Sequence, residues 1–228
     1  MLCTAILGKV IYRHREERKA KVFRYGLVNS NALFIGLPII QSLLGDAGVL
    51  QLSMYMIFVR MFCWSYGLSL YTGVKSDWKG SFKRLLTHPC MIAAALGVAA
   101  MVTGIRLPAF LDRTLQYVSS CLMALSMLLI GVVLSEIKLK EVFRGDVWRF
   151  TALRLGVMPG IVFGLCKLCG VPYIVTATCT LVSGMPAASL TAVLAARYHG
   201  DSELGALLVA VSTILSAVTI PLWFMILQ

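Results

Sequence analysis

Acidic residues and histidines are scarce in this chain of 228 residues. It has 10 Asp and Glu residues and 3 His, and charged residues make up only 14% of the sequence. No Asp or Glu lies deep in a long apolar run, which excludes a proton relay built from carboxylates within this chain. Because clusters of His, Cys, Asp or Glu are also missing, the sequence predicts no metal site, no cofactor and no enzyme.

Long apolar runs dominate what is present. Hydrophobic residues account for 59% of the chain and the mean hydropathy is +0.84, which is too apolar for a soluble domain. The sequence therefore predicts an all-α integral membrane protein in a lipid bilayer. Apolar Leu2–Ile11 is too short to cross and is interpreted as the tail of a span. Seven complete spans of about bilayer length are expected at about 25–44, 49–73, 90–104, 111–135, 150–170, 173–196 and 204–227.

The net charge of +11 comes from short loops between the spans, so it does not indicate nucleic-acid binding. Basic loops at 13–24, 75–84 and 138–149 alternate with loops that carry few or no charges. Basic loops of membrane proteins stay on the cytoplasmic side. The alternation therefore predicts a multi-pass protein of the cell membrane, plasma or inner, with its C-terminus outside.

Two Gly-X-Pro motifs interrupt apolar runs at matching depths. Gly36-Leu37-Pro38 and Gly184-Met185-Pro186 each lie about 12 residues, or about 18 Å of helix, into a span. Loop charges indicate that the two spans are entered from opposite sides. Gly and Pro also make simple kinks in membrane helices. Breaks in corresponding segments of two half-repeats, however, favour a transporter binding site, and the two spans are expected to cross near these motifs.

Helix ends give the breaks their expected chemistry. The half-helix after each break directs free N–H groups and the positive end of its dipole to mid-membrane, where a carboxylate can bind. Pro38 and Pro186 are expected at or near the first helical positions. Carbonyls before each break offer ligands to Na⁺ or to a proton-bearing water, so the coupling ion, H⁺ or Na⁺, stays open.

Two arginines lie within spans. Arg60 is about twelve residues into its span, where a charge must face the bundle interior or a cavity. It is either a partner of a substrate carboxylate or a structural group that bonds backbone carbonyls or snorkels. Arg154 is close to the start of its span and is expected to snorkel to the cytoplasmic surface.

Several of these segments resemble the auxin efflux carrier family. The stretch from Asn31 to Pro38, with Gly45-Asp46, is similar to the family's fourth segment. Met185-Pro186-Ala187-Ala188 is similar to its ninth. The resemblance implies ten spans in two inverted five-span repeats, a fold like that of bile acid/sodium symporters, with the broken fourth and ninth helices crossing at the substrate site.

On this resemblance, residues 1–73 form an incomplete first repeat that begins in the third span. Residues 74–89 are the cytoplasmic connection, and residues 90–228 form a complete second repeat. The expected function is that of a secondary transporter, an efflux carrier of bacterial type, which moves a small organic anion such as auxin or a dicarboxylate by alternating access. The alternative is a non-transporting truncated subunit or fragment of such a carrier. A homodimer is compatible with either.

The candidate substrate-binding residues come from the two breaks and from the charged span. Two of these places depart from the family pattern: Arg60 stands where relatives usually carry an asparagine-like residue, and Ser189-Leu190-Thr191 where many carry an asparagine. The candidates are Asn31, Gly36, Leu37, Pro38, Arg60, Gly184, Met185, Pro186, Ala187, Ser189 and Thr191.

Overall fold

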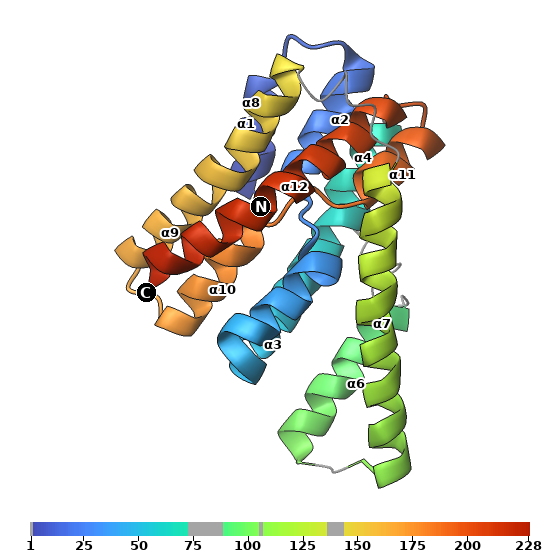
Figure 1. Cartoon of the computed structure of the whole chain (residues 1–228), viewed down its shortest axis with the longest axis vertical. Helices are drawn as coiled ribbons and strands as arrows, with labels where there is room; N and C mark the ends of the chain where they lie inside the picture. The colour runs from blue at the N-terminus through green and yellow to red at the C-terminus, as the bar shows by residue number, and fades with distance from the viewer. Residues whose placement is uncertain (1, 73–88, 105–106, 136–143) are drawn as a thin grey trace.

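The computed structural model describes residues 2–72, 89–104, 107–135 and 144–228 of the chain (Figure 1). Within the helices some side chains, that of Arg60 among them, lie outside the description, as do the basic residues expected at 75–84 and 138–140. All regular elements in the described ranges are helical, as predicted. Three stretches there are long and apolar enough to cross a bilayer: Ala32–Val59, Gly145–Leu168 and Ser202–Leu227.

The first part of the chain is built around one sharply bent helix. α3 turns at Gly45, whose φ of 61° lies in the left-handed region that glycine adopts without strain. The expected spans 25–44 and 49–73 are therefore joined through α3. The elements here are α1 (Leu2–Ile11), α2 (Glu17–Val28), the π-helical turn η1 (Ala32–Gly36), α3 (Leu37–Phe62), the π-helical turn η2 (Cys63–Gly67) and α4 (Leu68–Thr72).

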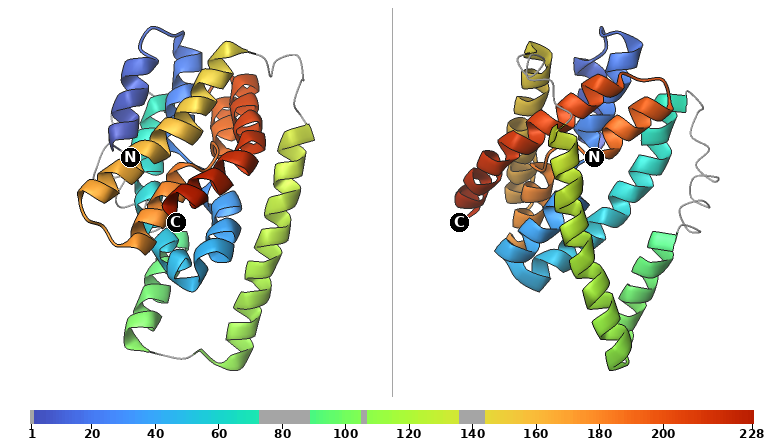
Figure 2. Two further views of the ribbon diagram at one scale, coloured as in Figure 1. Left: turned by 60° about the vertical axis from the view of Figure 1, so that its left-hand side comes forward. Right: turned by 45° about the vertical axis from the view of Figure 1, so that its right-hand side comes forward.

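The second part contains a helical hairpin and a packed group. α6 (Pro89–Thr103) and α7 (Ala109–Ser135) form the hairpin, whose far end projects beyond the other helices (Figure 2), while α7 also contacts η1 and α12. The packed group consists of α8 (Gly145–Ala152), the π-helical turn η4 (Leu153–Val157), α9 (Met158–Leu168), α10 (Tyr173–Ser183), α11 (Leu190–Arg197) and α12 (Ser202–Leu227).

α10 and α11 are too short to cross a membrane separately. With 11 and 8 residues, they extend about 16 Å and 12 Å, whereas the hydrocarbon core is about 30 Å thick. α12, in contrast, has 26 residues and is long and apolar enough to cross. The expected span 173–196 is thus two half-helices joined by an extended segment.

Two apolar clusters hold the bundle together. One joins α2, α8 and α12, where the Phe23 and Phe150 rings lie 6.0 Å apart. The other joins α3 and α10 around Ile40 and Leu181. Because lipid is as apolar as these side chains, close packing and hydrogen bonds, rather than escape from water, stabilise such contacts in a bilayer. The extended segment between α10 and α11 passes from one cluster to the other, since Met185 belongs to the second and Ala187 to the first.

One end of the molecule gathers basic segments. The α1–α2 connection and the start of α8 lie at the same end in Figure 1. Arg18 Nε donates to the His199 carbonyl at 3.1 Å, which ties the α11–α12 turn to this end as well. The position of these segments at one end of the molecule agrees with the alternation of basic and nearly uncharged loops. That this end faces the cytoplasm stays a prediction.

Asp201 caps α12, as its position after Gly200 suggests. Its carboxylate accepts from the Leu204 N–H at 2.9 Å. Asp201→Ala should lower the free energy of unfolding by about 1 kcal/mol, whereas Asp201→Asn, which keeps an acceptor, should change it little. Thermal unfolding of the purified protein in detergent measures both. Equal stability of the alanine variant and the parent would show that this cap does not hold the start of α12.

Candidate functional site

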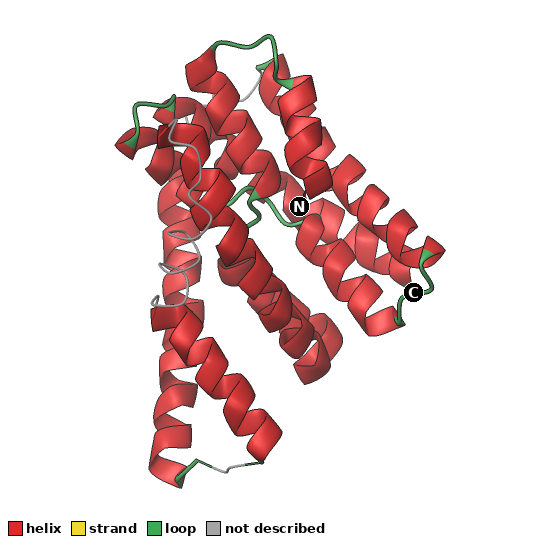
Figure 3. Cartoon of the chain, turned by 180° about the vertical axis from the view of Figure 1, so that it is seen from behind, coloured by secondary structure: helices red, strands yellow, loops and turns green. Residues whose placement is uncertain are grey.

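Two interrupted helices meet in the interior of the bundle. The first interruption covers residues 29–31, between α2 and η1, and the second covers 184–189, between α10 and α11. Figure 3 shows these loop segments among the helices, apart from the loops at the ends. They run antiparallel, with Ser30 opposite Ala187. The Asn31 N–H donates to the Pro186 carbonyl at 2.8 Å, and the Ala188 N–H donates to the Asn29 carbonyl at 3.0 Å.

The second interruption lies where its Gly-X-Pro motif predicts. α10 ends at Ser183 and Gly184 follows as its C-cap residue. Pro186, however, lies in the extended segment and not at the start of the next helix, which begins at Leu190. The expectation that Pro186 opens a half-helix is therefore wrong: its carbonyl instead accepts from Asn31, so the residue belongs to the paired segment.

The first interruption does not lie at Gly36-Leu37-Pro38, and that expectation is corrected. These residues are helical, and the break precedes them at residues 29–31. A proline in a helix lacks its N–H and crowds the carbonyl four residues earlier. Here the wider π-helical turn η1 comes just before Pro38, with the Gly36 N–H donating to the Asn31 carbonyl five residues back at 3.1 Å. We infer that this turn relieves the crowding and lets the helix continue.

Neither helix N-terminus at the meeting point is capped by its own side chain. Asn31 precedes η1 and Ser189 precedes α11, and neither caps the helix that it starts. Instead Asn31 Nδ2 lies 3.5 Å from Ser189 Oγ, across the two segments. The Thr191 hydroxyl is buried here without a hydrogen-bond partner among the described residues, and the buried Ser30 hydroxyl faces that of Tyr55. The starts of η1 and α11 therefore lie beside each other at this place.

Ser212 of α12 anchors the second interruption. Its Oγ accepts from the Ala187 N–H at 3.1 Å and donates to the Leu208 carbonyl at 2.6 Å. Ser212 is fully buried. Because an unpaired N–H in this environment costs free energy, the hydroxyl stabilises the extended backbone at Ala187.

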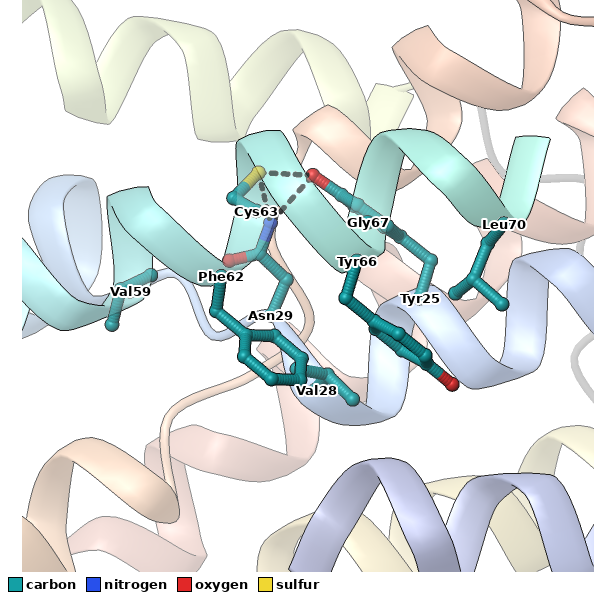
Figure 4. A pocket seen from close by; sticks show the side chains of 9 residues that line it. All are labelled: Tyr25, Val28, Asn29, Val59, Phe62, Cys63, Tyr66, Gly67 and Leu70. Atoms are coloured by element: carbon teal, nitrogen blue, oxygen red, sulfur yellow. Dashed lines mark hydrogen bonds between the residues drawn. The ribbon is translucent and has the colours of Figure 1, made fainter. Parts of the chain in front are cut away.

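A polar cluster anchors the first interruption (Figure 4). Asn29 Nδ2 donates to Tyr25 Oη at 2.6 Å and lies 3.3 Å from Cys63 Sγ, while Tyr25 Oη and Cys63 Sγ are 2.8 Å apart. The cluster lies beside a cavity of about 10 Å³, roughly enough for one water. Cys63 opens η2, so the cluster ties the break to the chain beyond α3.

Arg154 bonds to the end of α2 and to the second interruption, which overturns the expectation that it snorkels. It lies in η4 and is 2% exposed. Its Nε donates to the Met185 carbonyl at 3.1 Å and its Nη1 donates to the Leu27 carbonyl at 2.5 Å. In an unbroken helix the Leu27 carbonyl would accept from the Asn31 N–H, but that N–H donates to Pro186. The break therefore releases the carbonyl that Arg154 binds.

Most sequence-predicted residues gather at the meeting point. Gly36 lies about one turn after Asn31. It is still close to the second interruption, because a Cβ added to Gly36 would lie 3.6 Å from the Met185 side chain. Leu37 and Pro38 lie further along the helix, and the side chain of Arg60 lies outside the described residues. The residues at or beside the paired segments are Asn31, Gly184, Met185, Pro186, Ala187, Ser189 and Thr191.

Sequence reasoning missed Asn29, Ser30, Arg154 and Ser212. For the first two a signal was present, because the polar triplet 29–31 interrupts an apolar run and marks the break better than Gly36-Leu37-Pro38 does. Arg154 lies between two leucines in an apolar stretch. The neighbouring sequence, however, did not indicate which groups this charged side chain would bind.

A cleft of about 590 Å³ opens between the first half of α3 and α12. Ile35, whose N–H donates to the Asn31 carbonyl, lines it on one side, and Ser216, one turn after Ser212, lines it on the other. The walls are mostly apolar, with hydroxyls from Ser42, Thr213 and Ser216. The cleft thus begins within one helical turn of the paired segments.

The backbone pairing can be tested with a disulfide. Ser30 and Ala187 form an antiparallel pair between two flanking hydrogen bonds, for which a Cα separation of about 4.5 Å is typical, and disulfides accept such separations. Ser30→Cys with Ala187→Cys, in a chain whose native cysteines are replaced by alanine, should give a linked peptide by mass spectrometry that disappears on reduction. Ser30→Cys with Ala196→Cys, at the far end of α11, is the control. Equal linkage in both pairs, or none in the first, would contradict the pairing.

Comparisons with known proteins assign the chain to a family. A family model described as "Membrane transport protein" matches residues 1–82 and 78–224. An uncharacterized transporter of Methanocaldococcus jannaschii is 28% identical over 229 residues, which cover 96% of this chain and 71% of that protein. An uncharacterized transporter of Methanothermobacter thermautotrophicus is 29% identical over 198 residues, covering 86% of this chain and 65% of that protein. These names indicate a membrane transporter and not an enzyme. The chain therefore belongs to the membrane transport protein family, the auxin efflux carrier family that its motifs resemble.

Proposed function

We propose that this chain is a secondary transporter of the cell membrane that carries a small organic anion by alternating access. The observation that carries the proposal is the antiparallel pairing of two interrupted helices at Ser30 and Ala187. Non-helical backbone at membrane depth is tolerated only where protein buries it or a cavity is lined by it. Paired interruptions of this kind hold the substrate in known transporter folds.

The electrostatics of the meeting point favour an anion. Two helix N-termini, at Ala32 and Leu190, face it without side-chain caps, and each contributes about half a positive charge. No acidic side chain of the described residues bonds to Asn31, Ser189 or Thr191. A carboxylate placed there receives N–H and hydroxyl donors without an additional protein charge.

The arrangement also supports the proposed architecture of two inverted repeats, residues 1–73 and 90–228. α2 enters the meeting point from the end where the α1–α2 connection lies, and α10 enters from the opposite end, after the α9–α10 turn (Figure 1). α12, whose Ser212 bonds to the second interruption, also lines the cleft. We propose that the substrate body lies in this cleft while its carboxylate reaches the paired segments, and that rocking of the repeats exposes the site to either side.

The alternative is a non-transporting subunit or fragment of such a carrier. The matched part of this chain spans 71% and 65% of the length of the two relatives. Reconstitution of the chain into liposomes separates the two functions. Uptake of a bound carboxylate supports the carrier, whereas binding without uptake supports the alternative.

Asn31→Ala should weaken anion binding without unfolding the protein. The amide lies against Ser189 at the proposed site, and its loss removes one donor, worth about tenfold in affinity. Isothermal titration of purified protein with butyrate, benzoate and succinate measures the effect. Gln41→Ala, which truncates an exposed amide on α3, is the matched control and should bind as the parent does. Unchanged affinity in a folded Asn31→Ala variant would place the site elsewhere.

A further inference from the structure

Arg154 supplies the hydrogen bonds that the two carbonyl ends lack. The Leu27 carbonyl lies in the last turn of α2, and the Met185 carbonyl lies two residues after α10. Nε and Nη1 of the same guanidinium donate to them. One side chain, from η4 on a third segment of the bundle, thus bonds at the C-terminal ends of the two helices that lead into the interruptions.

The charge of Arg154 is matched by these helix ends. Each helix C-terminus carries about half a negative charge, so the ends of α2 and α10 together supply about one. None of the ion pairs found among the described residues includes Arg154. A buried cation without compensation would be strongly destabilising. The two carbonyl ends are therefore its counter-charge within the described part of the chain.

Carbonyl ends of broken helices are the places where transporters of this general design bind a coupling cation. Here a guanidinium already occupies both ends. The geometry points to Arg154 as a resident cation that replaces a bound metal ion, so that the site works without Na⁺ and takes a monoanion. This inference rests on the proposed function, of which it names the ion coupling and the substrate class.

The preference for a monoanion comes from the charges that remain. With Arg154 matched by the C-termini, the two N-termini at Ala32 and Leu190 leave about one positive charge, which one carboxylate balances. The Thr191 hydroxyl, in the first turn of α11, is buried without a hydrogen-bond partner among the described residues and offers this carboxylate a donor. A second carboxylate would meet no further charge from the described side chains of the paired segments.

Thermal unfolding in sodium chloride against choline chloride tests the resident cation without any substrate. The parent should unfold at the same temperature in both salts. Arg154→Gln, which keeps N–H donors but loses the charge, should unfold at a lower temperature and be partly restored by Na⁺ but not by choline. Arg154→Lys, which keeps the charge, should be insensitive to Na⁺. Thr151→Val, one turn earlier and bonded only to the Val147 carbonyl, is the matched control and should also be insensitive.

Two results of this experiment would overturn the inference. One is a Na⁺-dependent rise in the unfolding temperature of the parent, which would show that a metal ion binds beside Arg154. The other is equal loss of stability in both salts for Arg154→Gln, which would make the guanidinium a hydrogen-bond donor only. If Arg154→Gln does not fold, Arg154→Lys still tests the inference. A lysine variant that folds and is insensitive to Na⁺ supports a resident cation, whereas a lysine variant that does not fold contradicts it.

Titration with butyrate and succinate tests the substrate class. Both are four-carbon carboxylates, but at neutral pH butyrate carries one negative charge and succinate carries two. The parent should bind butyrate at least about tenfold more tightly than succinate at neutral pH, because the second charge is uncompensated. Succinate binding that equals or exceeds butyrate binding would overturn the preference for a monoanion. Arg60 would then be the next candidate for the partner of the second carboxylate. Failure of both carboxylates to bind would count against the proposed function, while the sodium experiment would still decide the role of Arg154.

Discussion

The hydrogen bonds between residues 29–31 and 186–188 are the constraint on which the rest of the structure depends. A helix interrupted inside a bilayer exposes backbone groups that lipid cannot satisfy, at a cost of several kcal/mol each. Here each interruption satisfies the other, through the Asn31 and Ala188 N–H groups. Ser212 and Arg154 then satisfy an N–H and two carbonyls that remain. Neither helix could be interrupted alone in this buried interior without leaving such groups unpaired.

In the described part of the chain, three π-helical turns lie next to the meeting point, and each adjusts a helix to it. η1 comes directly after Asn31, η2 opens with Cys63 beside Asn29, and η4 contains Arg154. A π-helical turn inserts one residue into a helix, rotates the later turns of that helix and frees backbone groups, and such turns often mark functional places. In η4 the Leu155 carbonyl accepts from Trp223 Nε1 of α12 at 2.8 Å. The turn that directs Arg154 inward is thus itself tied to a neighbouring helix.

Local pattern predicted the membrane class, the helical fold and the second interruption, because each depends on residues adjacent in sequence. It misplaced the first interruption, since Gly36-Leu37-Pro38 is compatible with a helix once a π-helical turn precedes it. The role of Arg154 depends on carbonyls 31 and 127 residues away, and hydropathy within one span carries no information about such partners. Snorkelling was the reasonable expectation for a charge near a helix start, and it fails because two broken helices provide a polar environment in the interior.

The pairing of Ser30 with Ala187 uses main-chain atoms only. The side chains at positions 30 and 187 can therefore change without loss of the two hydrogen bonds that flank this pair, as long as proline stays away from the two donors, Asn31 and Ala188. The peptide backbone thus joins the two segments, while the side chains of Arg154 and Ser212 hold that backbone in place. A substitution at position 30 or 187 changes the surface of the meeting point and leaves this joint intact.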